Sequence, residues 1–480
     1  MIMDKICKKC IEADDIFIYG AGVIAGIFYL YLKKLSIDYK VRAFIVSARK
    51  DNPYKKNDKE VWELEAAQDI MKESYVIVAT QKSVQVEIVK SLLDRGIVNT
   101  DCIPEMEMLD DLYKDLYKKP ISNNKILFSN MRGMGYGGNP KYIAQKLIEM
   151  DKEKELDLVW VVSDEKYNFP NRIRTVKQGT LDYYLEVATA RVWIDNVRKD
   201  GDIKKREGQY YIQAWHGAAP IKRVEMDVPE SLSTSYIDNA KKDSAMADLF
   251  LSGSEFYTQL YKRAFWYDGE IMEIGLPRQD VFWNMSEARK RVLNFYNIEE
   301  KKKIVLYAPT FRKEITTTAY TLDIPMVIKA LENRFGGEFE MLISKHPNNR
   351  YLDYAFSENS RYIDVAGYED FEELLATADI LISDYSGCMY DYSFTGKPIF
   401  LYQSDYEDYV ADRDFYFNMD ELPYITARSN SELMNKIENF DENTYRNAIK
   451  HFMESMGNFD KGEASIGVAE HIWKVVFGGI

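Results

Sequence analysis

The chain has 480 residues, of which 46% are hydrophobic and 14% aromatic, and its net charge at pH 7 is −14. This length is too great for one core and predicts about two to four domains, while the apolar content excludes a disordered chain. The negative charge argues against a general nucleic-acid binder, and four scattered cysteines do not form a disulfide framework, which indicates a reducing cytoplasm.

Residues 1–118 are predicted to form a first Rossmann-like α/β domain. Apolar runs at 16–19, 41–46 and 75–80 predict strands, and a helix is expected around 84–94. Residues 16–32 are uncharged, but at 17 residues they fall at the lower edge of a membrane-spanning length. Their glycine pattern favours a strand, a turn and a helix, so we expect a soluble segment.

A glycine-rich turn follows the first strand, with Gly20, Gly22 and Gly26 in a GxGxxxG pattern. Such a turn binds a dinucleotide in some Rossmann folds, but tight turns need glycine for steric reasons as well. The second strand is followed by Ser47 instead of the acidic residue that contacts a ribose. We therefore do not expect this turn to bind a dinucleotide. A role in docking a partner or in regulation is at least as good an interpretation of this domain.

Residues 119–287 are predicted to form a second α/β domain. Strands are expected at 125–128, 156–162, 192–194, 210–214, 249–251 and 271–274. A loop with four glycines precedes a predicted helix at 142–149; it could cradle a substrate or simply turn the chain.

His216 directly follows the strand at 210–214, and the carboxyl ends of strands are where open α/β sheets place their ligands. Gly217 allows close backbone approach, and Lys222 and Arg223 add positive charge. The alternative is a structural histidine that packs beside Trp215.

Residues 288–480 are predicted to form a third α/β domain with a helical tail. Strands are expected at 304–307, 339–343, 362–365, 380–382 and 399–402, and an acidic helix at 371–376. The stretch 381–400 predicts a strand, a polar turn, a helix and a strand. Ser383, Ser386 and Gly387 lie in that turn, which could hold a phosphate or merely cap the helix, and on this stretch alone the cap is the better interpretation.

Polar groups recur at the carboxyl ends of the predicted strands. These groups are Thr310, Arg312, Lys345, His346, Ser383 and Ser386 in the third domain, and His216 and Arg278 in the second. Strand ends converge on one edge of a doubly wound sheet, so two facing domains would bring both sets to one cleft. Cations, hydroxyls and imidazoles suit a polyanionic substrate such as a nucleoside diphosphate derivative.

The motifs resemble those of the CDP-glycerol glycerophosphotransferase family, the teichoic-acid primases and polymerases. They occur in the family's order and cover roughly residues 120–470. The matching segments are Trp215 to Gly217, Gly275 to Arg278, Ala308 to Arg312, Ser344 to Pro347, and Ser383 to Ser386. The resemblance implies a GT-B architecture of two Rossmann-like halves around a cleft, preceded here by the extra N-terminal domain.

The resemblance also implies residue roles. His216 would be the general base or another catalytic group on the acceptor side, and His346, with Lys345, would hold the pyrophosphate and stabilise the leaving group. The donor site would comprise Trp215, Gly217, Ala218, Arg278, Pro309, Thr310, Arg312, Ser344, Lys345, Ser383, Ser386, Gly387 and Asp391. We assign Asn139, Lys222 and Arg223 to an acceptor contact or to the surrounding loops.

Two departures from the family pattern bear on the donor. The family often has a second serine where this chain has Gly387, and a Thr-Pro pair where it has Ala218 and Ala219. Both changes remove hydroxyls near the donor, so they bear on which alcohol the donor carries more than on the reaction.

The implied reaction transfers a polyol phosphate from CDP-glycerol or CDP-ribitol to a hydroxyl of a lipid-linked or polymeric cell-wall or capsular acceptor, with release of CMP. Glycerol phosphate is the first choice. The family works at the cytoplasmic face of the membrane, so peripheral association is implied. No metal-ligand cluster is evident, so we expect no tightly bound metal, although Mg²⁺ could accompany the nucleotide. The alternatives are a GT-B glycosyltransferase that uses a UDP-sugar, and a non-catalytic nucleotide-sensing scaffold.

Overall fold

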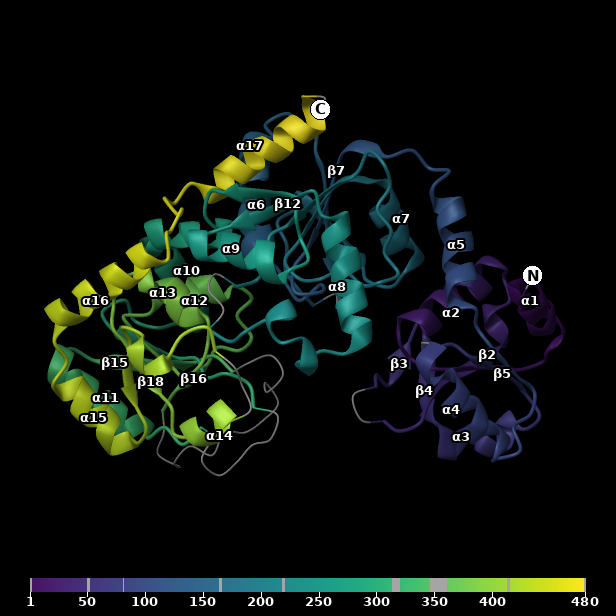
Figure 1. The fold of residues 1–480 in the computed structure, drawn as a ribbon, viewed down its shortest axis with the longest axis horizontal. Helices are drawn as coiled ribbons and strands as arrows, with labels where there is room; N and C mark the ends of the chain where they lie inside the picture. The colour runs from purple at the N-terminus through teal and green to yellow at the C-terminus, as the bar shows by residue number, and fades with distance from the viewer. Residues whose placement is uncertain are drawn as a thin grey trace.

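The computed structural model describes residues 2–49, 52–80, 82–163, 166–217, 221–312, 320–345, 361–411 and 415–478. Within these ranges the strands form three sheets, one after another along the chain, and helices pack around each of them (Figure 1). The chain is therefore α/β throughout, as the alternation of apolar runs and amphipathic segments predicts.

The N-terminal unit has the strand order β3-β4-β2-β1-β5-β6, and its strand pairs are parallel except for the β3–β4 hairpin. Its strands are β1 (Ile16–Tyr19), β2 (Val41–Val46), β3 (Lys55–Lys56), β4 (Lys59–Glu63), β5 (Tyr75–Val78) and β6 (Thr100–Cys102). Its helices are α1 (Ile2–Glu12), α2 (Val23–Lys34), α3 (Leu64–Met71), α4 (Lys82–Leu93) and α5 (Glu105–Leu116), with the 3₁₀ helix η1 (Asp38–Lys40). The apolar stretch 16–32 is thus β1 followed by part of α2. Within the described ranges no helix is long and apolar enough to cross a membrane.

Helix α5 connects the N-terminal unit to the next one. Tyr113 on α5 packs edge-on against Tyr184 of α7 (Leu181–Thr189), with ring centroids 6.5 Å apart. Lys204 forms an ion pair with Asp110 on the same helix. The apolar cores of the two units are continuous through this contact, and Figure 1 shows α5 standing between them.

The middle unit is a parallel sheet in the order β13-β12-β11-β10-β7-β8-β9. Its strands are β7 (Ser122–Ser129), β8 (Asp157–Val162), β9 (Ile173–Lys177), β10 (Ala190–Asp195), β11 (Tyr210–Gln213), β12 (Leu249–Ser252) and β13 (Glu270–Glu273). Its helices are α6 (Gly138–Met150), α7 (Leu181–Thr189), α8 (Thr234–Met246) and α9 (Glu255–Ala264), with η2 (Glu225–Asp227) and η3 (Pro229–Ser231).

The C-terminal unit is a second parallel sheet, in the order β16-β15-β14-β17-β18-β19, and η4 (Pro277–Trp283) and α10 (Met285–Tyr296) lead into it. Its strands are β14 (Lys303–Tyr307), β15 (Phe339–Ile343), β16 (Ile363–Asp364), β17 (Ile380–Ser383), β18 (Ile399–Tyr402) and β19 (Ile425–Ala427). The later helices are α11 (Ile324–Phe335), α12 (Phe371–Thr377), α13 (Cys388–Ser393), α14 (Tyr406–Ala411), α15 (Asn430–Glu438), α16 (Glu442–Ser455) and α17 (Ala464–Phe477), with η6 (Met419–Glu421).

The last helix, α17, returns to the middle unit. Its apolar face, which includes Val468 and Ile472, belongs to the same buried cluster as Ile143 of α6 and Ile212 of β11. In Figure 1, α17 (yellow) lies alongside α6. The chain therefore connects the middle and C-terminal units twice, first through η4 and α10 and again through α16 and α17. The predicted domain boundaries after residues 118 and 287 stay predictions.

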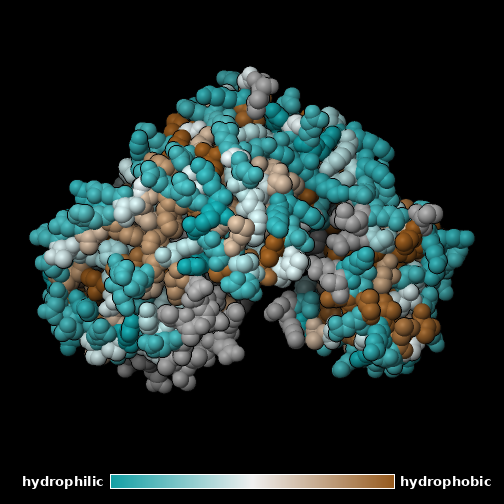
Figure 2. All heavy atoms as spheres, in the orientation of Figure 1, coloured by the Kyte–Doolittle hydropathy of each residue, from teal (hydrophilic) through white to brown (hydrophobic). Residues whose placement is uncertain are grey.

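The surface of the N-terminal unit is partly apolar. Figure 2 shows brown patches over this unit, on the right of the view. The exposed apolar side chains of this unit include those of Ile2, Ile11, Val86, Leu93 and Val98. Patches of this kind are often contact surfaces, but single exposed apolar side chains are also common.

Candidate active site

A large cleft lies between the middle and C-terminal units, with a volume of about 1760 Å³. Of the predicted site residues it is lined by His216, Arg278, Pro309, Thr310, Ser344, Lys345 and Ser386. These residues come from the ends of β11, β14, β15 and β17 and from η4. The convergence of strand ends from two sheets, which the sequence predicts, therefore exists. His346 and Ala218 lie outside the described residues.

An unusual backbone conformation turns His216 away from β11. Trp215 has a φ of +42°, in the left-handed region that a bulky residue rarely adopts. Its N–H donates to Oε1 of Gln213 at 2.9 Å, and its carbonyl accepts from Nδ2 of Asn139 at 2.9 Å. Hydrogen bonds thus fix both the N–H and the carbonyl of Trp215. The backbone strain is therefore concentrated at the residue immediately before the histidine.

The imidazole of His216 has a defined tautomer. Its Nδ1 lies 3.0 Å from the backbone carbonyl oxygen of Asn196. A carbonyl only accepts hydrogen bonds, so Nδ1 carries the hydrogen and Nε2 is left with a lone pair. This is the form in which a histidine accepts a proton from a hydroxyl.

Electrostatics keep this histidine neutral. The side chain is exposed to the cleft, but protein surrounds the cleft closely enough to disfavour the cation. Burial lowers the pKa of His216 to about 4, and the nearby cation of Arg278 acts in the same direction. At neutral pH the ring is therefore an unprotonated base.

Arg278 lies beside the loop that carries His216, and its guanidinium makes hydrogen bonds to protein groups. One guanidinium nitrogen donates to the carbonyl of His216 at 2.6 Å and to Glu372 at 3.1 Å. The other contacts both oxygens of Asp391, at 2.9 and 3.0 Å. Although burial disfavours its charge, Asp391 and Glu372 raise the pKa of Arg278 above its ordinary value.

Burial raises the pKa of the neighbouring Glu372, while the Arg278 cation acts to lower it. Arg278 is thus a buried junction between the histidine loop and the C-terminal unit, and its charge is already balanced by protein carboxylates.

Two further predicted residues lie behind the cleft lining. Asn139 is fully buried; its amide donates to the carbonyls of Ala214 and Trp215, and its oxygen accepts from the N–H of Arg278 at 3.0 Å. Asp391 is occupied by Arg278 and Gln279. Both side chains connect loops to one another.

In the C-terminal unit, Thr310 occupies the loop after β14. Its N–H donates to Asp384 at 2.9 Å, and its hydroxyl accepts from Arg312 at 2.6 Å. Arg312 also pairs with Asp384 and Asp405, at 2.9 and 2.6 Å, and stacks over the ring of Tyr409. Arg312 is therefore a brace that fixes the Thr310 loop, and it does not line the cleft.

The serines after β17 point in different directions. Ser383 is buried and donates to the carbonyl of Ala308 at 2.7 Å, which ties β17 to β14. Ser386 lines the cleft, and its hydroxyl accepts from the N–H of Cys388 at 3.3 Å. Gly387 precedes the first residue of α13. The turn thus contains both a structural hydroxyl and a cleft-facing one.

Ser344 and Lys345 follow β15 and line the cleft. Lys345 is paired with Asp364 at 3.0 Å. Lys222 and Arg223 lie elsewhere: Lys222 stacks over Tyr409, and Arg223 contacts the carbonyl of Phe415 at 3.4 Å. Neither of these two cations is part of the cleft lining.

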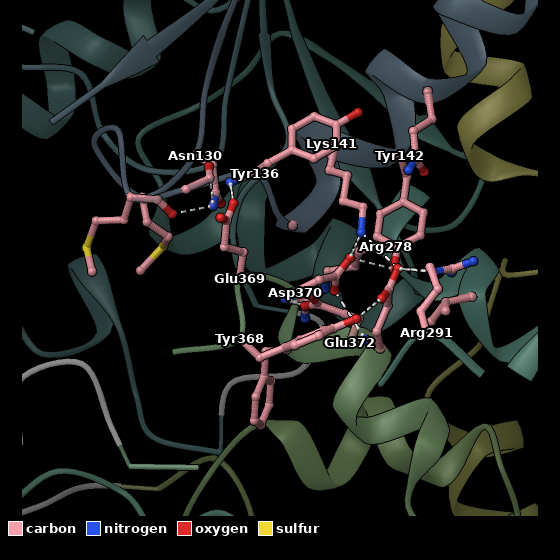
Figure 3. Close-up of a pocket in the computed structure, with 18 of the residues that line it drawn as sticks. Asn130, Tyr136, Lys141, Tyr142, Arg278, Arg291, Tyr368, Glu369, Asp370 and Glu372 are labelled. Carbon is pink, nitrogen blue, oxygen red and sulfur yellow. Dashed lines mark hydrogen bonds and ion pairs between the residues drawn. The ribbon is translucent and has the colours of Figure 1, made fainter. Parts of the chain in front are cut away.

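A set of charges that the sequence analysis does not identify joins the two halves inside the cleft. Lys141 on α6 is buried and pairs with Asp370 and, at 2.9 Å, with Glu373, both at the start of α12. Figure 3 shows the side chain of Lys141 extending from α6 toward Asp370. Glu369 accepts from the N–H of Tyr136 at 3.0 Å and from that of Asn168 at 3.3 Å. The acidic helix at 371–376 is a sequence signal for part of this set, but nothing local identifies Lys141.

In the N-terminal unit, close packing explains one of the three glycines of the predicted GxGxxxG pattern. Gly20 has a φ of +118°, and a Cβ there would lie 2.6 Å from the carbonyl oxygen of Ala79. A Cβ on Gly26 would lie 2.9 Å from the side chain of Lys56, in the β3–β4 hairpin. Gly22 faces open space. Close packing against the backbone of Ala79 thus explains Gly20, whereas Gly26, within α2, meets only the end of a flexible lysine side chain.

Comparison with known proteins identifies relatives of the two units around the cleft. Residues 112–474 match the model of the family described as CDP-Glycerol:Poly(glycerophosphate) glycerophosphotransferase. The chain is 30% identical over 371 residues to a teichoic acid poly(glycerol phosphate) polymerase of Staphylococcus epidermidis, covering 74% of this chain and 51% of the relative. It is 27% identical to a teichoic acid glycerol-phosphate transferase of Staphylococcus aureus, covering 80% and 99%.

A solved structure of the wall teichoic acid polymerase TagF superposes with a TM-score of 0.68 at 26% identity, covering 84% of this chain and all of that one. The paired sheets around a cleft are thus the GT-B-type arrangement that the sequence predicts. The chain spans about half the length of two of the polymerases that it matches, at 51% and 52%.

Proposed function

We propose a phosphotransfer reaction for this chain, which belongs to the CDP-Glycerol:Poly(glycerophosphate) glycerophosphotransferase family. The chain transfers a polyol phosphate from a CDP-activated donor to a hydroxyl of a cell-wall or capsular polymer and releases CMP. Glycerol phosphate is the preferred unit, because several relatives are named for glycerol phosphate. Ribitol-phosphate polymerases are also among the relatives, so CDP-ribitol is the second donor to test.

The observation that carries this proposal is the neutral imidazole of His216 on the wall of the cleft, with its Nδ1–H held by Asn196. In the proposed step, Nε2 takes the proton of the acceptor hydroxyl. The acceptor oxygen forms a bond to the phosphorus that carries the polyol, and the bond from that phosphorus to the bridging oxygen breaks. The electron pair leaves with CMP. Positioning and charge stabilisation supply most of the acceleration.

We place the donor against the C-terminal unit. Thr310, Ser344, Lys345 and Ser386 offer hydroxyls and a cation along that wall of the cleft. His346 follows Lys345 in the sequence, and we propose that it stabilises the CMP leaving group. Mg²⁺ would enter as a companion of the nucleotide. The acceptor approaches from the side of the middle unit, where His216 lies.

We further propose that the protein works in the cytoplasm, at the inner face of the membrane. The support for this is the family's polymer acceptor, because a growing wall polymer is made where nucleotide-activated donors are available.

The test is CMP release by the purified protein. CDP-glycerol, CDP-ribitol and UDP-sugars are each supplied with a teichoic acid primer, and the nucleotide products are separated by ion-exchange chromatography. We expect CMP from a CDP-polyol, and a large loss of activity in His216→Gln, since general-base catalysis contributes about 10²- to 10⁴-fold. His451→Gln is the control, because His451 is exposed on α16. UDP release from a sugar donor, without CMP, would overturn the proposal.

A further inference from the structure

We propose that Asn196, interlocked with Asn130, is a positioning residue for His216. This inference rests on the proposed function, because it assigns a role within the same transfer step. Three adjacent strands of the middle sheet, β7, β10 and β11, end at this place. Asn130 follows β7, Asn196 follows β10, and His216 lies after β11.

The two asparagine side chains bind one another and the backbone around them. Nδ2 of Asn196 donates to Oδ1 of Asn130 at 2.7 Å, while Oδ1 of Asn196 accepts from the N–H of Met131 at 2.8 Å. Nδ2 of Asn130 donates to the carbonyl of Met134 at 3.0 Å. Both side chains are buried, with 5% and 2% of their surface exposed for Asn130 and Asn196. Each amide is therefore held in one orientation by protein groups, although both residues line the cleft.

A glycine lets the chain close over this pair. Gly138 has a φ of +60°, and a Cβ there would lie 2.9 Å from both Oδ1 of Asn130 and Nδ2 of Asn196. The start of α6 thus packs directly onto the amide pair. A larger residue at this position would displace the two asparagine side chains. This is a physical reason for one of the four clustered glycines.

The backbone carbonyl of Asn196 is the acceptor that fixes the tautomer of His216. The side chain of Asn196 fixes the peptide that presents this carbonyl. The same pair makes hydrogen bonds to the glycine-rich loop, residues 131–138. Glu369 of the C-terminal unit accepts a hydrogen bond from the same loop, at the N–H of Tyr136. Figure 3 shows Asn130, Tyr136 and Glu369 grouped together at one side of the cleft. The donor-side unit is thereby connected to the orientation of the base through hydrogen bonds.

Charged groups near the histidine do not replace this contact. Arg278 reaches the backbone carbonyl of His216 and is balanced by Glu372 and Asp391. Arg198 lies over the ring of Trp215 and pairs with Asp243. Within the part of the chain that the structure describes, the ring of His216 makes one hydrogen bond, in which Nδ1–H donates to the carbonyl of Asn196.

Two isosteric variants separate positioning from a simple effect of charge. Asn196→Asp keeps the acceptor for Met131 but places an oxygen against Oδ1 of Asn130. Asn130→Asp keeps the acceptor for Asn196 but loses the donor to Met134. We expect Asn196→Asp to lower kcat about 100-fold, the loss that a misplacement of about 1 Å can cause. We expect Asn130→Asp to raise KM while kcat changes only a few-fold, because the loop is loosened and the histidine is not.

Asn443→Asp, which adds the same charge on the exposed side of α16, is the control and should leave both constants unchanged. Asn196→Ser removes the amide without adding charge, and it decides the question if Asn196→Asp does not fold. Equal kinetic effects in the two aspartate variants, or a kcat in Asn196→Ser that matches the parent protein, would overturn the inference.

A second readout does not depend on activity. Nitrogen-15 correlation spectra of the four histidine rings, assigned with His216→Gln, should show a single Nδ1–H tautomer for His216 in the parent protein. A mixture of tautomers is expected in Asn196→Ser. If the parent protein releases no CMP from any CDP-polyol, the proposed function fails. If it releases CMP but the ring shows the Nε2–H tautomer, the positioning role alone fails.

Discussion

Arg278 and Asp391 meet in a buried ion pair at the junction of the two halves of the cleft, where one guanidinium nitrogen lies 2.9 and 3.0 Å from the two carboxylate oxygens. Arg278 belongs to η4, which leads out of the middle unit, and Asp391 belongs to α13 of the C-terminal unit. Each side chain has less than a tenth of its surface exposed. A pair of this kind is costly to bury and far more costly to break on one side.

Arg278→Met should therefore destabilise the fold strongly. The variant keeps most of the side-chain volume but leaves Asp391 and Glu372 without their cation. We expect the free energy of unfolding to fall by about 3–5 kcal/mol, measured by urea unfolding followed by circular dichroism. The control is Arg446→Met, whose parent side chain is 64% exposed and pairs with Glu442; it should change stability by less than about 1 kcal/mol. Similar unfolding midpoints for the two variants would contradict this account of Arg278.

Asp460 gives the fold a dependence on pH. One of its oxygens accepts from the N–H of Leu276 at 2.7 Å. Burial, with Asp280 and Asp391 acting in the same direction, raises the pKa of Asp460 to about 8. An unfolded aspartate has a pKa of about 3.9. Between these values the folded state holds a proton that the unfolded state releases, so this group stabilises the fold at low pH and loses that contribution as pH rises toward 8.

Asp460→Asn should remove this part of the pH dependence. The slope contributed by one such group is at most about 1.4 kcal/mol per pH unit. Thermal midpoints measured from pH 5 to pH 8 should fall less steeply in the variant than in the parent. Asp441→Asn is a matched control: the hydrogen bond from Thr444 lowers the pKa of that exposed carboxylate, so its contribution is constant over this range. A slope in Asp460→Asn equal to that of the parent would show that the carboxyl does not hold the proton.

Most of the parallel strands were predictable because they are buried apolar runs. The predicted bounds 16–19, 41–46, 339–343 and 399–402 coincide with β1, β2, β15 and β18. The strands β3, β4, β6, β9 and β19 were missed. They have partly exposed faces, and β9, Ile-Arg-Thr-Val-Lys, alternates in a way that a short loop also can. Length and alternation alone do not separate such strands from loops.

The site was predictable to the level of strand ends and no further. Topology brings His216, Thr310, Lys345 and Ser386 to one cleft because parallel strands all end at the same edge. The direction of each side chain could not be predicted in this way, since Ser383 faces β14 while Ser386 faces the cleft. Contacts between Lys141 and Asp370 join residues more than two hundred positions apart, so no local pattern indicates them.

Glu369→Gln should weaken the hold of the C-terminal unit on the glycine-rich loop. The carboxylate accepts from the N–H groups of Tyr136 and Asn168, one on each oxygen. An amide keeps one acceptor and sets a donor against the other N–H. We expect KM in the CMP-release assay to rise about tenfold, the equivalent of about 1.4 kcal/mol and at the low end of what a hydrogen bond to a charged group contributes. Glu407→Gln, at a side chain that is 88% exposed on α14, should leave KM unchanged. A fall in kcat without a change in KM would contradict a role in holding the loop.

The proposed base predicts an unusual pH profile. An ordinary histidine has a pKa of about 6.5, so a base of that kind would lose half its activity near that pH. Burial lowers the pKa of His216 to about 4, with the Arg278 cation in the same direction. The unprotonated form therefore persists at neutral pH and is lost only as pH falls through about 4. Because kcat/KM reports the free enzyme, we expect it to stay level from pH 7 to pH 5 and to fall below that.

The acid limb of kcat should lie at higher pH than that of kcat/KM, because the phosphates of a bound donor favour the imidazolium. Both profiles are measured by brief assays in mixed buffers, with circular dichroism at each pH to show that the fold is intact. Residual activity in His216→Gln should lack the acid limb, while His451→Gln should keep it. A limb in kcat/KM near pH 6.5 would place the reacting histidine in a solvated environment, in conflict with the enclosed position of His216 in the cleft.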